Sequence, residues 1–183
     1  INTAVFISGR GSNLKSLYNF SKKKISPIKI ILVFSNNKNA AGLKYAKEKN
    51  LYSIYLRDKK IKILEIRLLK ILNKKKIKLI CLAGYMKILS YNFIKKFKGK
   101  IINIHPSLLP KYKGLNTHNR VLQNNEPFTG CTVHFVNNKL DSGKIILQKK
   151  IKVLRNDSIK KLSKRVLNEE HKIYPKAIIK LFS

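Results

Sequence analysis

Acidic side chains are scarce in this chain. Only eight of its 183 residues are Asp or Glu, against 41 Lys and Arg, and the formal net charge is +33. An excess of this size is typical of nucleic-acid-binding proteins. However, 35 of the 41 basic residues are Lys, whereas recognition of phosphates and bases favours the forked guanidinium of Arg. The lysines are spread over the whole chain among many Ile and Asn, so we attribute the charge to the compositional drift of an AT-rich genome. We expect no specific nucleic-acid binding, and a basic RNA-binding module is the alternative.

Paired cysteines, long apolar runs and a leader pattern are also missing. Cys81 and Cys131 stand 50 positions apart, and no C-x-x-C or H-x-x-x-H spacing occurs, so we predict no metal site and no redox pair. No apolar run reaches the roughly 18 residues of a membrane span, and the first residues lack a charged-then-apolar signal pattern. We therefore expect a cytoplasmic protein that contacts no membrane, either a monomer or a weak homodimer. The length and the even composition predict a single domain over residues 1–183.

A glycine-containing turn follows the first apolar run. Residues 4–7 predict a strand, and the sequence Ser-Gly-Arg-Gly-Ser-Asn leads from it into a helical pattern that begins at Leu14. A dinucleotide fingerprint would need a third glycine at position 14 and an acid about 20 residues later, but the first acid is Glu48. No Gly-Lys-Ser/Thr follows, which excludes a P-loop. A site for a small phosphate remains, with Gly11, Ser12 and Asn13 as donors, and an ordinary strand-to-helix turn is the alternative.

The next hundred residues alternate between expected strands and expected helices. Strands are predicted at 28–34, 52–55 and 79–84, and helices at 40–49 and 59–75. This alternation predicts an α/β fold with three layers, a mainly parallel central sheet and a Rossmann-like N-terminal half. In the helix at 59–75, the apolar stripe that should face the core is Ile61, Leu64, Leu68 and Leu72.

The rest of the chain is organised around residues 103–114, Asn-Ile-His-Pro-Ser-Leu-Leu-Pro-Lys-Tyr-Lys-Gly. The apolar run at 100–102 predicts a buried strand that ends with Asn103 and His105, and residues two apart on a strand share a face. Pro106 and Pro110 should stiffen the following loop, and one of the two preceding bonds is expected to be cis. An isolated Asn-x-His also fits a strand end with a surface histidine.

The full run resembles the active-site stretch of the folate-dependent formyltransferases. Within that family, Ser-Leu-Leu-Pro-Lys-Tyr-x-Gly is most similar to the branch that formylates glycinamide ribonucleotide. Residues 82–90, Leu-Ala-Gly-Tyr-Met-Lys-Ile-Leu-Ser, are similar to the family's wall around the pterin ring of the folate. The resemblance implies that the folate is bound by Tyr85, Met86, Lys87, Ile88, Leu89, Asn103 and Leu140.

The same resemblance gives roles to other segments. Gly-x-Gly-Ser-Asn-Leu is similar to the loop that holds the phosphate of the ribonucleotide, which implies that role for Gly11, Ser12 and Asn13. Leu-Asp-x-Gly at 140–143 matches a loop in which the Asp contacts the catalytic His, and Ser142 stands where Gly is usual and should stiffen the loop. His118 and His134 match histidine positions of the family, although either is equally well explained as structural. Residues 57–61 are shorter than the family loop that brings a basic residue near the folate glutamate, a place that Lys59 or Lys60 could take.

The last helix is expected to carry one carboxylate on its buried face. Asn156 and Asp157 are good capping residues, and the buried stripe should run Ile159, Leu162, Val166, Glu170, Ile173, Ala177. A carboxylate in such a stripe needs partners, because burying it unpaired is costly. The run Glu-Glu-His-Lys-Ile-Tyr-Pro resembles the family helix in which Glu170 binds the ribose hydroxyls of the substrate. Pro175 should kink or end this helix.

The resemblance implies a formyl transferase of purine biosynthesis and one-carbon metabolism, which moves a formyl group from 10-formyltetrahydrofolate to the amino group of glycinamide ribonucleotide. The residue chemistry also fits acyl transfer, because Asn103 can donate to an oxyanion and His105 can move a proton, with Asp141 beside it. No G-x-S-x-G elbow occurs, and no nucleophile is required. Methionyl-tRNA formyltransferases and formyltetrahydrofolate hydrolases share parts of this pattern, but we expect neither of their additional domains within these 183 residues.

Overall fold

The computed structural model describes residues 1–57 and 60–182, and it divides into two compact units, Ile1–Ile102 and Asn103–Ser183. The hydrogen-bonded strand order is β3-β2-β1-β4-β5-β6-β7. The predicted α/β class with a mainly parallel sheet is therefore confirmed. Of the two lysines considered for the folate glutamate, Lys59 lies outside the described residues.

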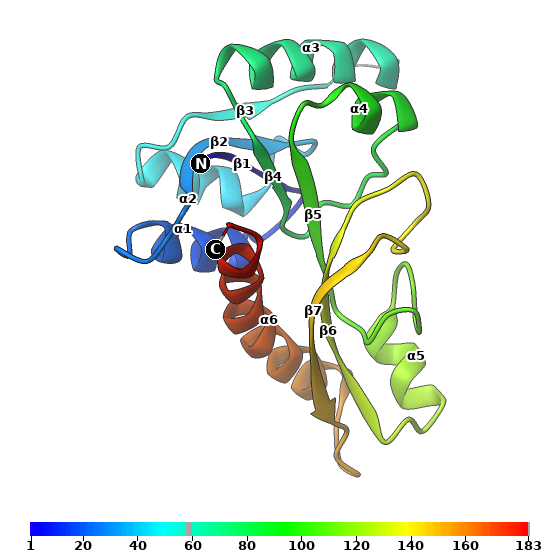
Figure 1. Ribbon diagram of the computed structural model, residues 1–183. Helices are drawn as coiled ribbons and strands as arrows, with labels where there is room; N and C mark the ends of the chain where they lie inside the picture. Colours follow the sequence, from blue (N-terminus) through cyan, green and yellow to red (C-terminus); the bar gives the residue numbers. More distant parts are fainter. Residues whose placement is uncertain (58–59, 183) are drawn as a thin grey trace. The chain divides into compact units, whose positions relative to one another are not determined.

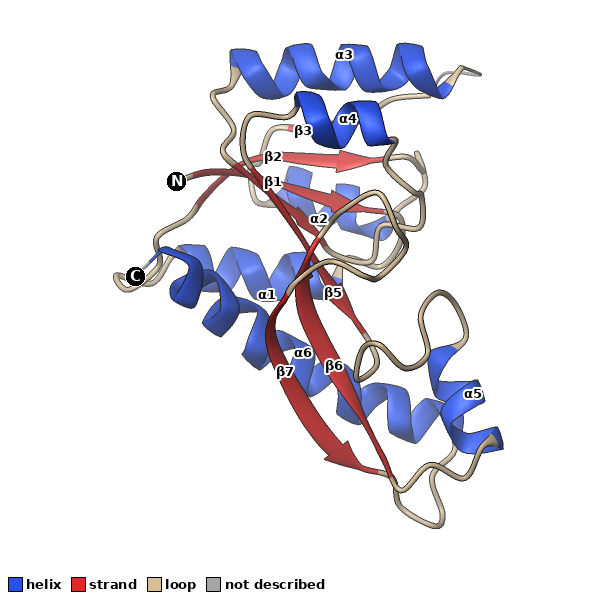
Figure 2. Ribbon diagram, turned by 45° about the vertical axis from the view of Figure 1, so that its right-hand side comes forward, coloured by secondary structure: helices blue, strands red, loops and turns tan. Residues whose placement is uncertain are grey.

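The first unit is a parallel sheet covered on both faces. Its strands are β1 (Asn2–Ile7), β2 (Lys29–Ser35), β3 (Ser53–Tyr55) and β4 (Leu79–Leu82), and β1 pairs in parallel with both β2 and β4. Two helices, α1 (Ser12–Ser21) and α2 (Ala41–Glu48), lie on one face of these strands (Figure 1). The other face carries α3 (Ile61–Lys74) and α4 (Tyr91–Lys96), as Figure 2 shows from a second direction. Three layers and a Rossmann-like strand order are thus present in this half of the chain.

Apolar side chains fill the sheet of the first unit on both faces, as expected for parallel strands that are covered twice. Ala4, Val5, Phe6 and Ile7 are all fully buried. The ring of Phe6 meets that of Phe34 edge to face, with centroids 4.9 Å apart. Because this core holds β1 rigidly, the loop that follows it starts from a fixed point.

The second unit is built on an antiparallel hairpin and a long helix. The strands β6 (Phe128–Phe135) and β7 (Ile145–Lys152) form the hairpin, with a register shift between Val133 and His134. The long helix α6 (Ile159–Phe182) packs against both strands, and the short helix α5 (Thr117–Gln123) contacts α6. The chain enters this unit along β5 (Lys100–His105), the strand predicted to carry Asn103 and His105. Of the two prolines after it, Pro110 follows a cis bond.

The predicted stripe of α3 is buried at Leu68 and Leu72, half-buried at Leu64 and wrong at Ile61. Ile61 is 51% exposed, whereas Glu65, which had no predicted role, is only 5% exposed and lies on the same face as Leu68 and Leu72. The reason is a polar partner: Glu65 accepts hydrogen bonds from the backbone N–H of Ser90 at 2.8 Å and from the Ser90 hydroxyl. These bonds let a carboxylate replace an apolar residue inside the unit.

The start of α6 also differs from the prediction. The helix begins at Ile159, and the hydroxyl of Ser158 accepts from the N–H of Lys161 at 3.2 Å, so Ser158 is the cap and not Asn156 or Asp157. Asp157 instead accepts from the N–H of Leu154 and pairs with Arg165. Ile159, expected in the buried stripe, is 50% exposed. It is the first residue of α6, and the buried face of the helix begins at Leu162.

The remainder of the α6 prediction is largely confirmed. Leu162, Val166, Glu170, Ile173 and Ala177 are buried as predicted. Pro175 does not end the helix, which continues to Phe182. Among the described residues, no helix is long and apolar enough to cross a membrane.

Candidate active site

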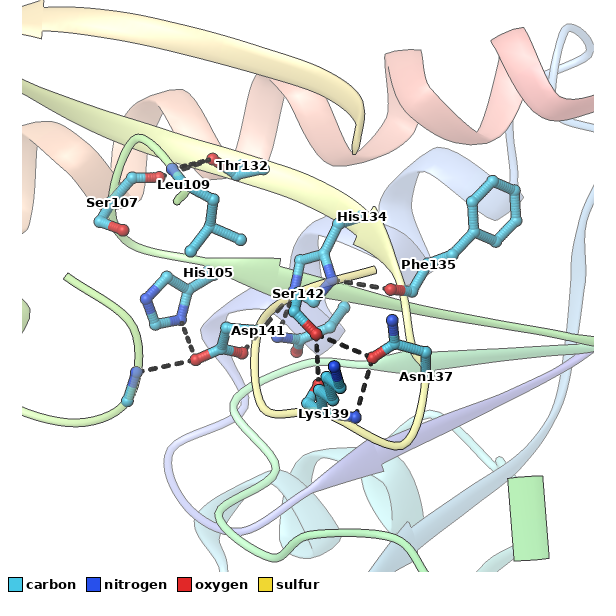
Figure 3. Close-up of polar contacts among 12 residues, drawn as sticks. His105, Ser107, Leu109, Thr132, His134, Phe135, Asn137, Lys139, Asp141 and Ser142 are labelled. Carbon is cyan, nitrogen blue, oxygen red and sulfur yellow. Dashed lines mark hydrogen bonds and ion pairs between the residues drawn. The ribbon is translucent and has the colours of Figure 1, made fainter. Parts of the chain in front are cut away.

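A buried imidazole and a buried carboxylate face each other in the second unit. Nδ1 of His105 lies 3.3 Å from Oδ2 of Asp141, and the two side chains are only 7% and 9% exposed. His105 is the last residue of β5, and Asp141 comes from the loop between β6 and β7. The structure thus brings together two residues 36 positions apart, as the resemblance implied (Figure 3).

The other nitrogen of the His105 ring is held by the backbone. Nε2 lies 2.8 Å from the carbonyl oxygen of Tyr112, a residue without a predicted role. A carbonyl can only accept, so this contact is a hydrogen bond only when Nε2 carries a proton. Both ring nitrogens therefore face acceptors, and both contacts are satisfied together when the ring is doubly protonated. The ring is thus held between a carboxylate and a backbone carbonyl, which fixes its orientation.

The loop that carries Asp141 is pinned at several points. Asp141 itself has φ +45°, and its Oδ2 accepts from the backbone N–H of Gly114 at 2.8 Å. The hydroxyl of Ser142 donates to Oδ1 of Asn137 and to the carbonyl of Lys139, both at 3.0 Å (Figure 3). Both contacts stay within the loop, and the stiffening by Ser142 remains a prediction.

Asn103 is oriented by His134, which lies on β6. Nδ2 of Asn103 is 3.2 Å from Nε2 of His134, and Nδ1 of His134 is 2.8 Å from the carbonyl oxygen of Phe135. Since the carbonyl can only accept, Nδ1 of the neutral ring holds the proton and Nε2 accepts from the amide of Asn103. Burial lowers the pKa of His134 and so favours this neutral form. One N–H of Asn103 is used in this way, and no partner for the second is seen in the part of the chain that the structure describes.

His118, at the start of α5, stays close to this group without a hydrogen bond to it. Burial lowers its pKa, and the charge of His105 lowers it further. Its Nδ1 is buried and has no hydrogen-bond partner among the residues that the structure describes. His134 therefore contacts a predicted site residue, whereas His118 is linked to the site only through the charge of His105, which lowers its pKa.

The predicted phosphate donors surround the start of α1 in the first unit. Gly11 has φ +76°, and its carbonyl accepts from the N–H of Lys15, so the helix begins at Ser12. No described side chain caps this helix, whose first turn is therefore suited to an anion. An added Cβ at Gly11 would lie 2.7 Å from the Cα of Gly42, which shows how closely α1 and α2 approach here.

The predicted folate wall is fixed at both of its ends. At the start, the N–H of Met86 donates to the hydroxyl of Ser8 at 2.8 Å, and at the end Glu65 holds Ser90. Ser8 follows β1, and its N–H donates to the carbonyl of Gly84 at 3.1 Å. The predicted phosphate loop and the wall segment, residues 85–89, are thus joined through Ser8. They meet at the carboxyl ends of two neighbouring parallel strands, where such sheets bind ligands.

Within the wall segment, three consecutive exposed side chains lie between the half-buried Tyr85 and the buried Leu89. Tyr85 packs on Phe6, and burial raises the pKa of its phenol. Leu89 is buried, whereas Met86 is 64% exposed, Ile88 is 68% exposed and Lys87 also faces solvent. The segment therefore presents apolar side chains outward from a fixed backbone.

The two remaining predicted residues lie in the second unit. Leu140 is 52% exposed beside Asp141, which suits a side chain that covers a ligand. Glu170 is 7% exposed on α6 and faces β6, where its charge adds to burial in raising the pKa of the Cys131 thiol to about 12. Cys131 is therefore a protonated core residue and not a nucleophile.

Comparison with known proteins agrees with this geometry. The profile of the formyl transferase family matches residues 1–178. The chain belongs to the formyl transferase family. The phosphoribosylglycinamide formyltransferase of Haemophilus influenzae is 43% identical over 183 residues, covering 98% of this chain and 86% of that protein. The solved phosphoribosylglycinamide formyltransferase from Brucella melitensis is 39% identical, with a TM-score of 0.93 and coverage of 98% of this chain and 94% of that one.

Other relatives are much longer proteins. The trifunctional purine biosynthetic protein adenosine-3 of Gallus gallus is 42% identical over 181 residues, which cover 97% of this formyl transferase family member. The chain spans only 18% of the length of that relative. The similarity to the trifunctional protein is therefore confined to one segment of it.

Proposed function

We propose that this protein transfers a formyl group from 10-formyltetrahydrofolate to the amino group of glycinamide ribonucleotide, a step of purine biosynthesis. The observation that carries the proposal is the buried His105–Asp141 pair beside an oriented Asn103. A donor amide, an imidazole and a carboxylate are the groups that acyl transfer to an amine requires.

The reaction requires stabilisation of a negatively charged oxygen and transfer of a proton. The amine nitrogen attacks the formyl carbon, the new C–N bond forms, and the electron pair of the C=O bond moves onto oxygen. The free N–H of Asn103 donates to that oxygen. Return of the electron pair breaks the bond to N10 of the folate, and the proton lost by the amine is delivered to N10. His105 carries this proton at Nδ1, and Asp141 stabilises the protonated ring.

The same proposal assigns substrate binding to the remaining predicted residues. Gly11, Ser12 and Asn13 bind the phosphate of the ribonucleotide, and Glu170 binds its ribose hydroxyls. The exposed apolar side chains of the wall segment and Leu140 contact the folate, whose edge is read by backbone groups of residues 85–89. The uncapped start of α1 and the fixed ends of the wall segment support these assignments.

The proposal treats residues 1–183 as one formyltransferase domain, because the family profile runs across both units. We place the reaction in the cytoplasm, with a monomer or weak homodimer as the working form and without a specific nucleic-acid partner. No metal is assigned a step, since the attacking amine and the described side chains supply each charge and proton that the transfer needs.

The decisive experiment is a formylation assay with two acceptors. Purified protein is given 10-formyltetrahydrofolate with either glycinamide ribonucleotide or a formyl-acceptor tRNA, and formyl incorporation is measured. We expect turnover of the ribonucleotide alone and its loss in His105→Ala. Formylation of the tRNA, or ribonucleotide turnover that survives His105→Ala unchanged, contradicts the proposal.

A further inference from the structure

The backbone of Tyr112 supplies the contact that holds the Nε2 side of the His105 ring. Tyr112 also has φ +56°, a left-handed conformation that is unfavourable for a residue with a bulky side chain. A backbone in this region persists only when surrounding contacts hold it there. The position of the His105 ring therefore depends on whatever fixes Tyr112.

Three side chains hold the ring of Tyr112. Its hydroxyl donates to Oε1 of Glu126 at 2.9 Å and accepts from Nδ2 of Asn124 at 3.0 Å. The guanidinium of Arg120 lies 5.2 Å from the ring centroid, within the range of a cation–π contact. All three partners come from α5 or the turn that follows it, so they tie the loop after His105 to that helix.

Glu126 accepts hydrogen bonds from both Lys111 and Tyr112, and we call these three residues the cluster. The same Oε1 that takes the Tyr112 hydroxyl also accepts from Nζ of Lys111 at 2.8 Å, so two consecutive loop residues end on one oxygen. The bond from Lys111, and then that from Tyr112, lower the pKa of Glu126, which keeps the carboxylate charged. In a chain with so few acids, no other described carboxylate pairs with Lys111 or Tyr112.

The cluster is open to solvent, unlike the buried pair that it supports. Lys111, Tyr112 and Glu126 line a cavity of about 220 Å³, together with Leu108, Thr129 and Lys150. A charge pair at such an exposed place contributes little to stability by itself. We therefore expect the Lys111–Glu126 pair to act on the conformation of the Tyr112 backbone, whose carbonyl oxygen contacts His105.

We infer that Glu126 is a positioning residue for His105, acting through the hydroxyl and the backbone carbonyl of Tyr112. The inference rests on the proposed function insofar as His105 is the proton carrier. Loss of the Glu126 acceptor frees the Tyr112 ring, relaxes its backbone and removes the acceptor from Nε2. The imidazole then samples orientations in which Nδ1 no longer faces Asp141.

The chain offers a matched control for this experiment. Lys172 and Glu169 form an ion pair at 2.6 Å, with side chains 63% and 21% exposed, against 66% and 20% for Lys111 and Glu126. Glu169→Ala removes a pair of the same exposure that does not touch Tyr112. Tyr112→Phe removes a single oxygen, and Glu126→Gln keeps an amide oxygen that can still accept from the Tyr112 hydroxyl.

The first measurement is steady-state kinetics. We expect Glu126→Ala and Tyr112→Phe each to lower kcat about tenfold, since misplacing a reacting group by a fraction of an ångström has effects of this order. KM for both substrates should stay within about twofold, because no binding group is altered. The double variant should lose no more than either single one, Glu126→Gln should recover most of the rate, and Glu169→Ala should match the parent.

The second measurement does not depend on activity. Nitrogen-15 NMR of the imidazoles, with His105 assigned by comparison with His105→Ala, reports whether Nε2–H is hydrogen-bonded. We expect this signal to shift or broaden in Glu126→Ala and Tyr112→Phe but not in Glu169→Ala. The inference is overturned if the His105 signal is unaffected by both variants. It is also overturned if Glu126→Ala and Tyr112→Phe change kcat no more than Glu169→Ala does. If the parent protein transfers no formyl group, the proposed function fails, and the NMR comparison still decides the role of Glu126.

Discussion

Oδ2 of Asp141 faces Nδ1 of His105 across 3.3 Å in a place where both side chains are more than nine-tenths buried. The same oxygen accepts from the N–H of Gly114. Asp141→Asn keeps an oxygen for Gly114 and therefore the shape of the loop, but removes the charge that stabilises a protonated His105. We expect kcat to fall by roughly 10² or more, with substrate KM nearly unchanged, in steady-state assays.

A double variant distinguishes a catalytic unit from two independent effects. His105→Ala should lose about as much rate as Asp141→Asn, and the two changes together should cost little beyond either one, because they act on the same proton. If the two losses multiply, or if Asp141→Asn stays within a few-fold of the parent, Asp141 is only a loop residue.

Binding of the ribonucleotide phosphate is best tested at Ser12. Removing its hydroxyl in Ser12→Ala leaves the helix start and its backbone donors in place. We expect KM for the ribonucleotide to rise about tenfold while KM for the folate stays constant, since one hydrogen bond to a charged group is lost. An equal loss for both ligands argues against a phosphate site at this loop.

Substitution of Gly11 should change the stability of the fold as well as ligand binding. Its φ of +76° and the 2.7 Å approach to the Cα of Gly42 leave no room for a Cβ. Gly11→Ala should therefore lower the free energy of unfolding by about 1–2 kcal/mol or more, the cost of a left-handed backbone with a side chain. Denaturant titration measures this, and Gly9→Ala is the control, because nothing lies within 4 Å of its added Cβ.

Glu65 connects the interior of the first unit to the folate wall. Glu65→Ala leaves the N–H and hydroxyl of Ser90 without their acceptor, so we expect a loss of about 1–3 kcal/mol in the free energy of unfolding. KM for the folate should rise more than KM for the ribonucleotide, because Ser90 ends the wall segment. Glu48→Ala, at an exposed acid of α2, should change neither. A folate KM that remains at the parent value refutes the link to the wall.

Stability should decrease as the pH falls below neutrality. Burial lowers the pKa of His118, His134 and His171, whereas each returns to its ordinary value near 6.5 on unfolding. Below that value the unfolded chain binds more protons than the folded one, so the free energy of unfolding decreases as the pH is lowered. Thermal melts between about pH 7.5 and 5.5 should show a declining Tm, and a smaller decline in His171→Gln. A constant Tm over this range is the contrary result.

The positive charge yields a prediction about nucleic acids. If it reflects composition, binding to duplex DNA or RNA should be weak, indifferent to sequence and abolished as salt rises through the physiological range. Fluorescence anisotropy over a salt series measures this. Tight, sequence-selective binding at physiological salt would favour the RNA-binding alternative.

The sequence predicted those features that depend on local pattern. The apolar runs around Phe6 and Ile102 defined buried strands, and the spacing of Asn103 and His105 placed them on one face. Asp141 was found only through its motif, because the approach of residue 141 to residue 105 is a property of the folded hairpin. Contacts made by backbone atoms, such as the carbonyl of Tyr112 on His105, have no side-chain signature and were missed.

Errors in the helices have a similar origin. The buried face of α3 was misplaced because Glu65 is stabilised by Ser90, a partner 25 positions away that periodicity does not reveal. Ser8 was overlooked as the link between the predicted phosphate loop and the predicted wall, since its partner Met86 lies 78 positions away in the sequence. For Glu65, the signal that could have been used is a carboxylate within the apolar face of a helix, together with Ser90 as a capping residue later in the chain.

Gly143 limits how the loop of Asp141 can evolve. A Cβ at this position would lie 1.7 Å from the carbonyl oxygen of Phe135, so the base of the loop accepts no side chain. Lys139, earlier in the same loop, faces solvent and is under no such packing constraint. A lineage whose codons drift toward lysine and asparagine can therefore change exposed positions such as 139, while Asp141, two residues from the sterically restricted Gly143, keeps its position.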